Sequence, residues 1–212
     1  MIGENGQLFG LSAQTWLWLD QFGILFGNIL ILLTFIGAAV AFLRRDSLRR
    51  WLQAMRFRRV GEQISDVRGR WQGVIFTVSH EETPRWVIDM VEPDAIALVA
   101  TMQSMQAAES LRGHAREKGI RATGPLLLDE ADDPGETRDQ VKRAIRKMRR
   151  EGIRHIAVDV TGGKTPMSLG AFMAAQELAV PAIYVTAPHN QKLRLPDLTR
   201  AVVRVVSGVE EK

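Results

Sequence analysis

An uncharged, mostly apolar stretch of 22 residues lies near the N-terminus of the 212-residue chain, from Phe22 to Leu43. As a helix rising about 1.5 Å per residue it would extend roughly 33 Å, which is close to the ~30 Å hydrocarbon core of a bilayer. A signal peptide begins with basic residues, whereas residues 1–43 contain neither Lys nor Arg. The run therefore predicts a transmembrane helix over residues 22–43, with a buried helix of a soluble protein as the alternative.

The charges that flank this run predict its orientation. Seven arginines fall within residues 44–59 against one acid, Asp46, whereas residues 1–21 carry only Glu4 and Asp20. Basic residues stay on the cytoplasmic side of a membrane helix. We therefore expect a single-pass protein of the cell (inner) membrane, with residues 1–21 outside and all that follows the helix in the cytoplasm.

Residues 44–70 form the next predicted segment, a basic amphipathic helical connector. Leu48, Trp51, Leu52 and Met55 supply apolar positions at helical spacing. Because the arginines of this segment follow directly on a predicted membrane helix, we expect them to bind anionic lipid headgroups. RNA binding by the same arginines is the alternative.

Small residues inside the predicted membrane helix indicate that several copies associate. At 100° per residue they fall on about the same face, where they would let helix backbones approach closely. Asn28 lies roughly 120° from this face and is expected to contact another helix or line a water-filled pore, rather than face lipid. The stripe consists of Gly23, Gly27, Thr34, Ala38 and Ala41.

The remaining residues, 71–212, predict one α/β domain. Their net charge is zero, so the basicity of the chain (pI about 9.8) belongs to the first 70 residues. The chain has no cysteine, and its four histidines are scattered, so we expect no disulfide and no metal site. Short apolar strands alternate with helices, which is typical of a Rossmann-like, doubly wound and mostly parallel sheet. The strands are expected at 73–78, 95–100, 125–128, 156–160, 182–186 and 201–206, with helices at about 83–90, 105–118, 137–150 and 166–178.

The stretch from Ile156 to Met167, IAVDVTGGKTPM, carries the clearest functional signal. A buried strand is followed by two glycines, a lysine and a helix that begins near Pro166. Backbone N–H groups in such a turn, together with the start of the helix, bind anions. A nucleotide-triphosphatase loop would need glycine at position 158, where this chain has Val158.

A binding site is therefore predicted where the winding direction of the sheet reverses, at the carboxyl ends of the strands. The first and fourth strands are expected to be neighbours there, with the end of the second strand beside them. The residues at these ends offer hydroxyl and amide donors and one lysine, but no carboxylate pair and no nucleophile–base pair, so we expect binding without catalytic residues. They are Thr77, Ser79, His80, Thr101, Gln103, Ser104, Thr161, Gly162, Gly163, Lys164 and Thr165.

The same stretch resembles the signature of CARF domains, the CRISPR-associated Rossmann-fold sensors. That signature is TGGTK or TGGKK followed by a hydrophobic or proline position and Met, and here the order is TGGKT, followed by Pro166 and Met167. The resemblance covers about residues 71–212 and adds Met167 to the expected site. It implies a two-fold dimer of domains that binds a cyclic oligoadenylate messenger of type III CRISPR systems, most commonly cyclic tetra-adenylate.

Members of this family usually carry a nuclease or winged-helix module, and the chain ends soon after its last predicted strand. We therefore expect the membrane helix to supply the output, as in membrane-anchored CARF effectors of antiviral defence. Ligand binding would then assemble the spans of a dimer or tetramer into a pore, with no cofactor, no metal and no direct DNA or RNA target. Two alternatives stay open, namely a ring nuclease that cleaves its own ligand and an anchored sensor that recruits a separate effector.

Overall fold

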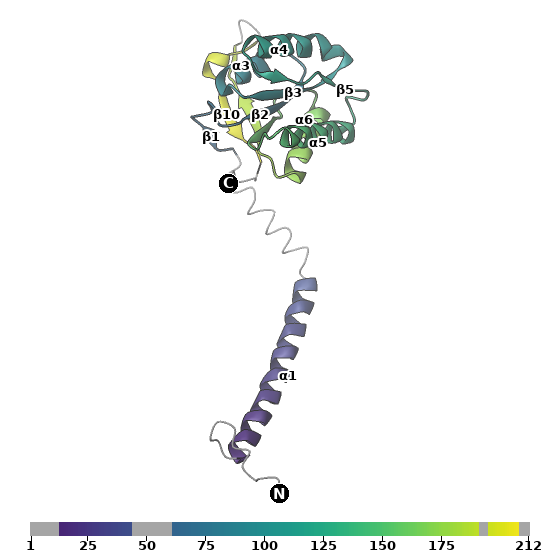
Figure 1. Cartoon of the computed structure of the whole chain (residues 1–212). Coiled ribbons are helices and arrows are strands. Elements are labelled where there is room, and N and C mark those ends of the chain that lie inside the picture. The colour runs from purple at the N-terminus through teal and green to yellow at the C-terminus, as the bar shows by residue number, and fades with distance from the viewer. Residues whose placement is uncertain (1–12, 44–60, 191–194, 208–212) are drawn as a thin grey trace. The chain divides into compact units, whose positions relative to one another are not determined.

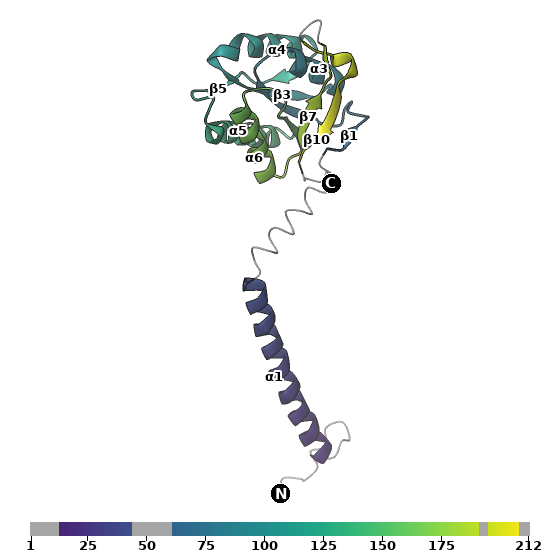
Figure 2. The same ribbon diagram turned by 180° about the vertical axis from the view of Figure 1, so that it is seen from behind.

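The computed structural model describes residues 13–43, 61–190 and 195–207, which belong to two compact units, Met1–Gln53 and Ala54–Lys212. Figures 1 and 2 show the chain from two sides. Most of the predicted connector, residues 44–60, lies outside the described residues.

The described part of the first unit is one long helix, α1, Ala13–Leu43. Its segment Gln14–Val40 is long and apolar enough to cross a membrane, and none of this segment is buried. The helix begins well before the uncharged run and therefore includes Asp20. The Thr34 hydroxyl donates to the Leu30 carbonyl at 2.8 Å, so this polar side chain is satisfied within its own helix.

The second unit is an α/β fold around one eight-stranded, mostly parallel sheet, as predicted. The strand order is β1-β10-β7-β6-β2-β3-β4, with β5 also paired to β3. All pairings from β7 to β4 and β5 are parallel, whereas β10 is antiparallel to both β7 and β1. The strands are β1 Gln63–Ile64, β2 Gly73–Val78, β3 Ala95–Thr101, β4 Arg121–Ala122, β5 Leu126–Leu128, β6 Ile156–Asp159, β7 Ala182–Thr186 and β10 Val202–Val205.

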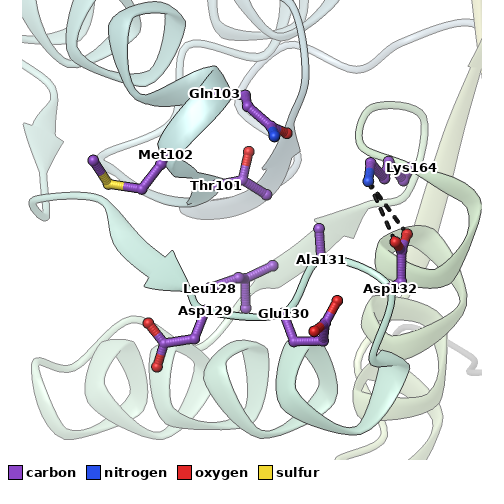
Figure 3. A pocket seen from close by; sticks show the side chains of 9 residues that line it. All are labelled: Thr101, Met102, Gln103, Leu128, Asp129, Glu130, Ala131, Asp132 and Lys164. Atoms are coloured by element: carbon purple, nitrogen blue, oxygen red, sulfur yellow. Dashed lines mark hydrogen bonds and ion pairs between the residues drawn. The ribbon is translucent and has the colours of Figure 1, made fainter.

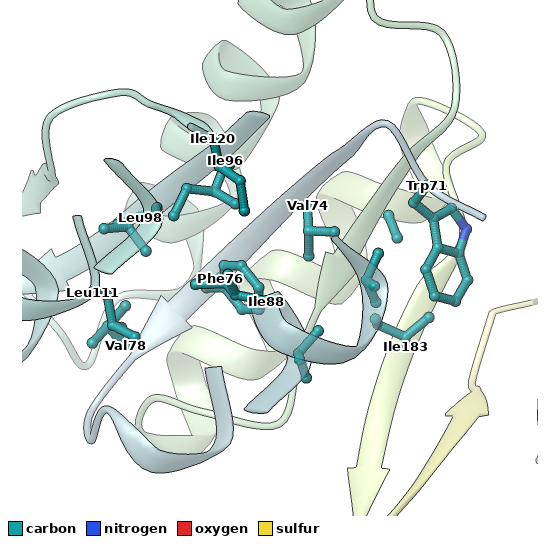
Figure 4. Packing of buried hydrophobic residues seen from close by; sticks show 14 of the residues in the cluster. Trp71, Val74, Phe76, Val78, Ile88, Ile96, Leu98, Leu111, Ile120 and Ile183 are labelled. Atoms are coloured by element: carbon teal, nitrogen blue, oxygen red, sulfur yellow. The ribbon is translucent and has the colours of Figure 1, made fainter. Parts of the chain in front are cut away.

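One face of the sheet is covered by α3 (Glu82–Val91) and α4 (Met105–Glu117). Alternate residues of a strand point to opposite faces, so Val74, Phe76 and Val78 of β2 all face this side. They pack with Ile88 and Leu111 of the two helices in the cluster shown in Figure 4. This burial fixes the register of the central strand.

The other face is covered by α5 (Pro134–Arg150) and α6 (Thr165–Glu177), which lie side by side in both views. The alternate residues of β2 and β6, including Ile75 and Val158, pack here with side chains of both helices. The two helices approach closely at Gly170, where a Cβ atom would lie 2.2 Å from the Pro134 carbonyl oxygen. The backbones of the two helices are therefore in close contact at Gly170, and apolar side chains are buried around this contact.

The predicted helices and parallel strands are found at their places, with boundaries that differ by a few residues. The last strand is found at Val202–Val205, antiparallel to its neighbour. Strands β1 and β4 were not predicted, and neither was the small two-stranded sheet of β8 (His189–Asn190) and β9 (Leu195–Pro196). Strands of two residues carry no hydrophobic period from which they could be predicted.

Candidate ligand-binding site

The winding direction reverses between β2 and β6, as the sequence analysis expected. From β2 the chain winds to β3 on one side and later returns to β6 on the other, with Gly73 opposite Ile156 and Phe76 opposite Asp159. The carboxyl ends of these two strands therefore open side by side. The loop that follows β6, residues 160–164, lies against the end of β2, and we call it the glycine loop.

Two side-chain hydroxyls hold the glycine loop in place. The Thr77 and Ser168 hydroxyls both donate to the Gly162 carbonyl, at 2.5 and 3.0 Å. A Cβ atom on Gly162 would lie 2.3 Å from the Thr77 carbonyl oxygen, so only glycine fits there. Gly163 has a φ of +86°, a left-handed conformation that also favours glycine. Both glycines of the motif are therefore required by the shape of the loop.

Asp159 fixes the start of the glycine loop through hydrogen bonds. Its buried carboxylate accepts from the Thr161 N–H at 2.8 Å and from the Thr161 hydroxyl at 2.5 Å. The same hydroxyl accepts from the Val185 N–H of β7 at 2.7 Å. Burial raises the pKa of Asp159 to about 6, against the two hydrogen bonds from Thr161. Asp159 is thus a structural hydrogen-bond acceptor.

These contacts turn the Gly162 carbonyl inward and leave backbone donors at the start of α6 available. Among the described residues, the N–H groups of Gly162, Gly163 and Lys164 have no hydrogen-bond partner. Thr165, the first residue of α6, likewise has an N–H with no partner inside the helix. Free N–H groups at a helix N-terminus favour an anion such as a phosphate. We call this arrangement the anion cradle; its geometry is the one expected from the sequence, and binding of an anion there stays a prediction.

A cavity of about 340 Å³ lies beside the cradle, between the carboxyl ends of β3 and β5 and Lys164. Figure 3 shows Lys164 facing Asp132 on one side of it, with Thr101 and Gln103 across from them. The Lys164 Nζ lies 3.3 Å from an Asp132 carboxylate oxygen, and both side chains are at least half exposed. The remaining lining residues are Met102, Leu128, Asp129, Glu130 and Ala131.

One side of the cavity is formed by Asp129, Glu130 and Asp132, and we call it the acidic wall. The start of α5 holds it in place. The Glu136 carboxylate accepts from the N–H groups of Asp129 and Glu130, at 2.9 and 2.8 Å. Asp133 caps the helix by accepting from the Gly135 N–H at 2.7 Å. The backbone that carries Asp129 and Glu130 at the edge of the cavity is therefore held by hydrogen bonds, and Asp132 faces Lys164. The site predicted from the sequence did not include these acids.

The predicted site residues fall into two groups. Gln103, His80 and Thr165 are exposed, and Ser79 is half-buried next to the glycine loop. Thr101 and Ser104 are buried and cap each other, since the Ser104 hydroxyl accepts from the Thr101 N–H at 3.0 Å and Thr101 accepts from the Ser104 N–H at 3.3 Å. Their hydroxyls, like those of Thr77 and Thr161, serve the fold. Met167 is also buried, beneath Gly163, and supports the loop.

The fold and the site define a class: an α/β domain with an anion-binding loop at the reversal of its sheet and a polar cavity beside it. The described residues contain no group of acids and histidines that could hold a metal ion. The donors suit phosphate, and the acidic wall can accept from hydroxyl or amino groups of the same ligand. Such a combination fits a nucleotide better than a simple anion.

No protein-family model matches the chain, and neither does any curated protein. Among solved structures, Can2 from Sulfobacillus thermosulfidooxidans in complex with cyclic tetra-adenylate has a similar fold, with a TM-score of 0.48 and 16% identity over 55% of this chain and 33% of that one. Enterococcus italicus Csm6 bound to cyclic hexa-2′-fluoro-hexa-dAMP gives 0.47 and 12% over 56% and 34%. A type III CRISPR defence DNA nuclease activated by cyclic oligoadenylate gives 0.46 and 18% over 66% and 22%. The matches span about a third or less of those proteins.

Proposed function

We propose that this protein is a membrane effector of type III CRISPR antiviral defence that binds a cyclic oligoadenylate in its α/β domain. The observation that carries the proposal is the anion cradle of the glycine loop, with Lys164 beside it, in the sequence context of the CARF signature. The second support is α1, whose length and composition suit a membrane span. The proposed place is the cell membrane, with the α/β domain in the cytoplasm.

The size of the cavity favours a ligand shared between two copies. A cavity of about 340 Å³ is near the lower end of the range for drug-sized ligands, roughly 300–1,000 Å³, and takes only part of a four-nucleotide ring. Two copies related by a two-fold axis would each supply a cradle, so that cyclic tetra-adenylate lies across the dimer. The N–H groups and Lys164 then bind phosphate, and the acidic wall accepts from the nucleoside.

The proposed output is a pore built from α1 helices. A ligand can shift an assembly only if it binds one arrangement better than another, and a ligand that bridges two domains meets this condition. The small-residue face of α1, with Gly23 and Gly27 at its start, would pack between copies, and Asn28 would line the pore or join neighbouring helices. Replacing Asn28 by Leu should weaken assembly or conduction while leaving ligand binding unchanged.

Binding of cyclic tetra-adenylate to the detergent-solubilised full chain, measured by calorimetry, tests the site. Lys164→Glu should abolish binding, because it places a second negative charge beside Asp132. Lys147→Glu is a matched control: its side chain is 51% exposed against 50% for Lys164, and it too is near one carboxylate. Equal loss in both variants, or in neither, would reject the site.

The same samples also test whether the ligand is cleaved. We propose that the domain binds without cleaving, and chromatography after incubation should recover intact cyclic tetra-adenylate. Linear adenylate products that disappear in Lys164→Glu would instead establish a ring nuclease. If the ligand stays intact but purified protein alone never permeabilises liposomes, the output belongs to a recruited partner.

A further inference from the structure

A second charged surface lies on the helical layer of α5, away from the cradle. Six arginines and lysines toward the C-terminal end of α5 and just after it are exposed, and all but Arg149 belong to this surface. Of its four members within the helix, the last three follow the first by three, four and seven positions, so all four share one face. We call them the α5 basic cluster: Arg143, Arg146, Lys147, Arg150 and Arg154.

Most of this charge is not neutralised within the domain. Other basic residues of α5 contribute to the fold: Lys142 pairs with Glu177 at 2.5 Å, and Arg149 donates to the Leu178 carbonyl at 2.9 Å. By contrast, Arg143, Arg146 and Arg154 form no ion pair with any described residue. No ion pair within the described residues therefore explains why these three positions carry arginine.

The cluster lies at the end of the sheet where the chain enters the domain. α5 ends at Arg150, just before β6 begins at Ile156, so its C-terminus is at the amino ends of the parallel strands. β1 runs in the same direction as β7, because each is antiparallel to β10. Gly61, whose N–H donates to the Val205 carbonyl at 2.7 Å, is therefore at this end too. The cradle lies at the opposite end.

We propose that the α5 basic cluster docks on the anionic lipid headgroups of the bilayer that α1 crosses. This inference rests on the membrane part of the proposed function. Residues 44–60, which join α1 to the domain, reach at most about 60 Å when fully extended, so the cluster is tethered near a bilayer surface. Basic side chains near an anionic membrane each gain about 1 kcal/mol, or roughly fivefold in a docking equilibrium. Docking in this orientation directs the cradle away from the lipid, toward the soluble ligand.

The absence of cysteine allows a direct distance test on the full chain. His155→Cys places a fluorophore beside the cluster, and Gln106→Cys places one on the first turn of α4, near the cradle end; both positions are exposed. Each labelled protein is reconstituted in phosphatidylcholine vesicles with or without phosphatidylglycerol, both containing a lipid with a nitroxide quencher on its headgroup. Flotation of the vesicles at high salt reports separately whether α1 is inserted.

We expect quenching at position 155 that requires phosphatidylglycerol and falls with salt, and little quenching at position 106. Arg143→Gln with Arg146→Gln should lower the docked-to-undocked ratio about 30-fold. Arg143→Gln alone should lower the ratio about fivefold. Arg200→Gln is the matched single control: Arg200 is exposed, forms no ion pair with described residues and lies just before Val202, which pairs with Thr186 at the cradle end, so its loss should change the ratio little.

Two results would overturn the proposal while leaving the membrane span intact. In the first, the protein floats with the vesicles but quenching at position 155 is independent of phosphatidylglycerol. In the second, a fluorescein-labelled single-stranded RNA binds, the binding is lost in the Arg143/Arg146 variant, and lipid quenching is unchanged. The second result would assign the cluster to nucleic acid. Failure to float would refute the membrane helix itself.

Discussion

Replacing Gly162 by alanine is the sharpest test of how the site is built. The new methyl group would lie 2.3 Å from the Thr77 carbonyl oxygen, which belongs to the central strand and cannot move away. The glycine loop must therefore shift outward. The shift breaks the hydrogen bonds that the Gly162 carbonyl accepts from Thr77 and Ser168.

The expected loss of stability follows from these contacts. Overpacking of a tight site costs about 1–3 kcal/mol, and each lost hydrogen bond about 1 kcal/mol. Because relaxation of the loop relieves part of the clash, we expect a total near 2–4 kcal/mol, or roughly 5–15 °C in Tm for a domain of this size. The displaced N–H groups should also lower the affinity for cyclic tetra-adenylate at least tenfold.

The assay is thermal unfolding of the detergent-solubilised full chain, with calorimetry for the ligand. Gly113→Ala is the matched control, because Gly113 lies within α4 and a Cβ atom there meets nothing within 4 Å. That change should be neutral or stabilise the domain by up to about 1 kcal/mol. If Gly162→Ala melts and binds like the Gly113 variant, the account of the glycine loop is refuted.

Three further predictions concern single groups of the same domain. Because the folded-state pKa of Asp159 is raised from 3.8 to about 6, the domain should lose about 3 kcal/mol of stability as pH rises from about 4 to 6, and Asp159→Asn should remove this dependence in melting curves across that range. Asp132→Asn should weaken cyclic tetra-adenylate binding by up to about fivefold in calorimetry, since it removes a carboxylate of the acidic wall that is proposed to accept from the nucleoside; tighter binding would show instead that the exposed ion pair with Lys164 competes with the ligand. Gly170→Ala, which places a Cβ 2.2 Å from the Pro134 carbonyl oxygen, should separate α5 from α6 and cost about 1–3 kcal/mol, whereas an unchanged Tm would contradict the packing described.

The sequence predicts the sheet well because its strands are short apolar runs bounded by turn residues. Ile156 to Val160 is apolar apart from Asp159, and the same composition marks the runs at 73–78 and 95–100. The two glycines after β6 also indicate the shape of the loop. Two glycines in succession are typical of a backbone that approaches another segment closely or has a positive φ. The parallel direction of the strands, and the end of the sheet at which the site lies, can therefore be predicted from these local features.

The role of each hydroxyl could not be predicted in the same way. Serine and threonine cap helices and bind ligands with the same oxygen atom, so sequence alone does not separate the two uses. Thr101 and Ser104 cap each other, and Thr161 joins Asp159 to β7. The acidic wall was missed for a related reason: Asp132 reaches Lys164 through a packing of α5 against α6 that depends on residues far apart in the chain.

Ion efflux from liposomes that contain the purified full-length protein is the most direct test of the proposed function. We expect efflux only when cyclic tetra-adenylate is present on the side of the α/β domain, and none from the Lys164→Glu variant. Arg200→Glu, at an exposed arginine outside both the glycine loop and the α5 basic cluster, should respond like the unmodified protein. Efflux that is independent of the ligand, or no efflux while tight binding is confirmed by calorimetry, would contradict the claim that sensor and membrane output reside in one chain.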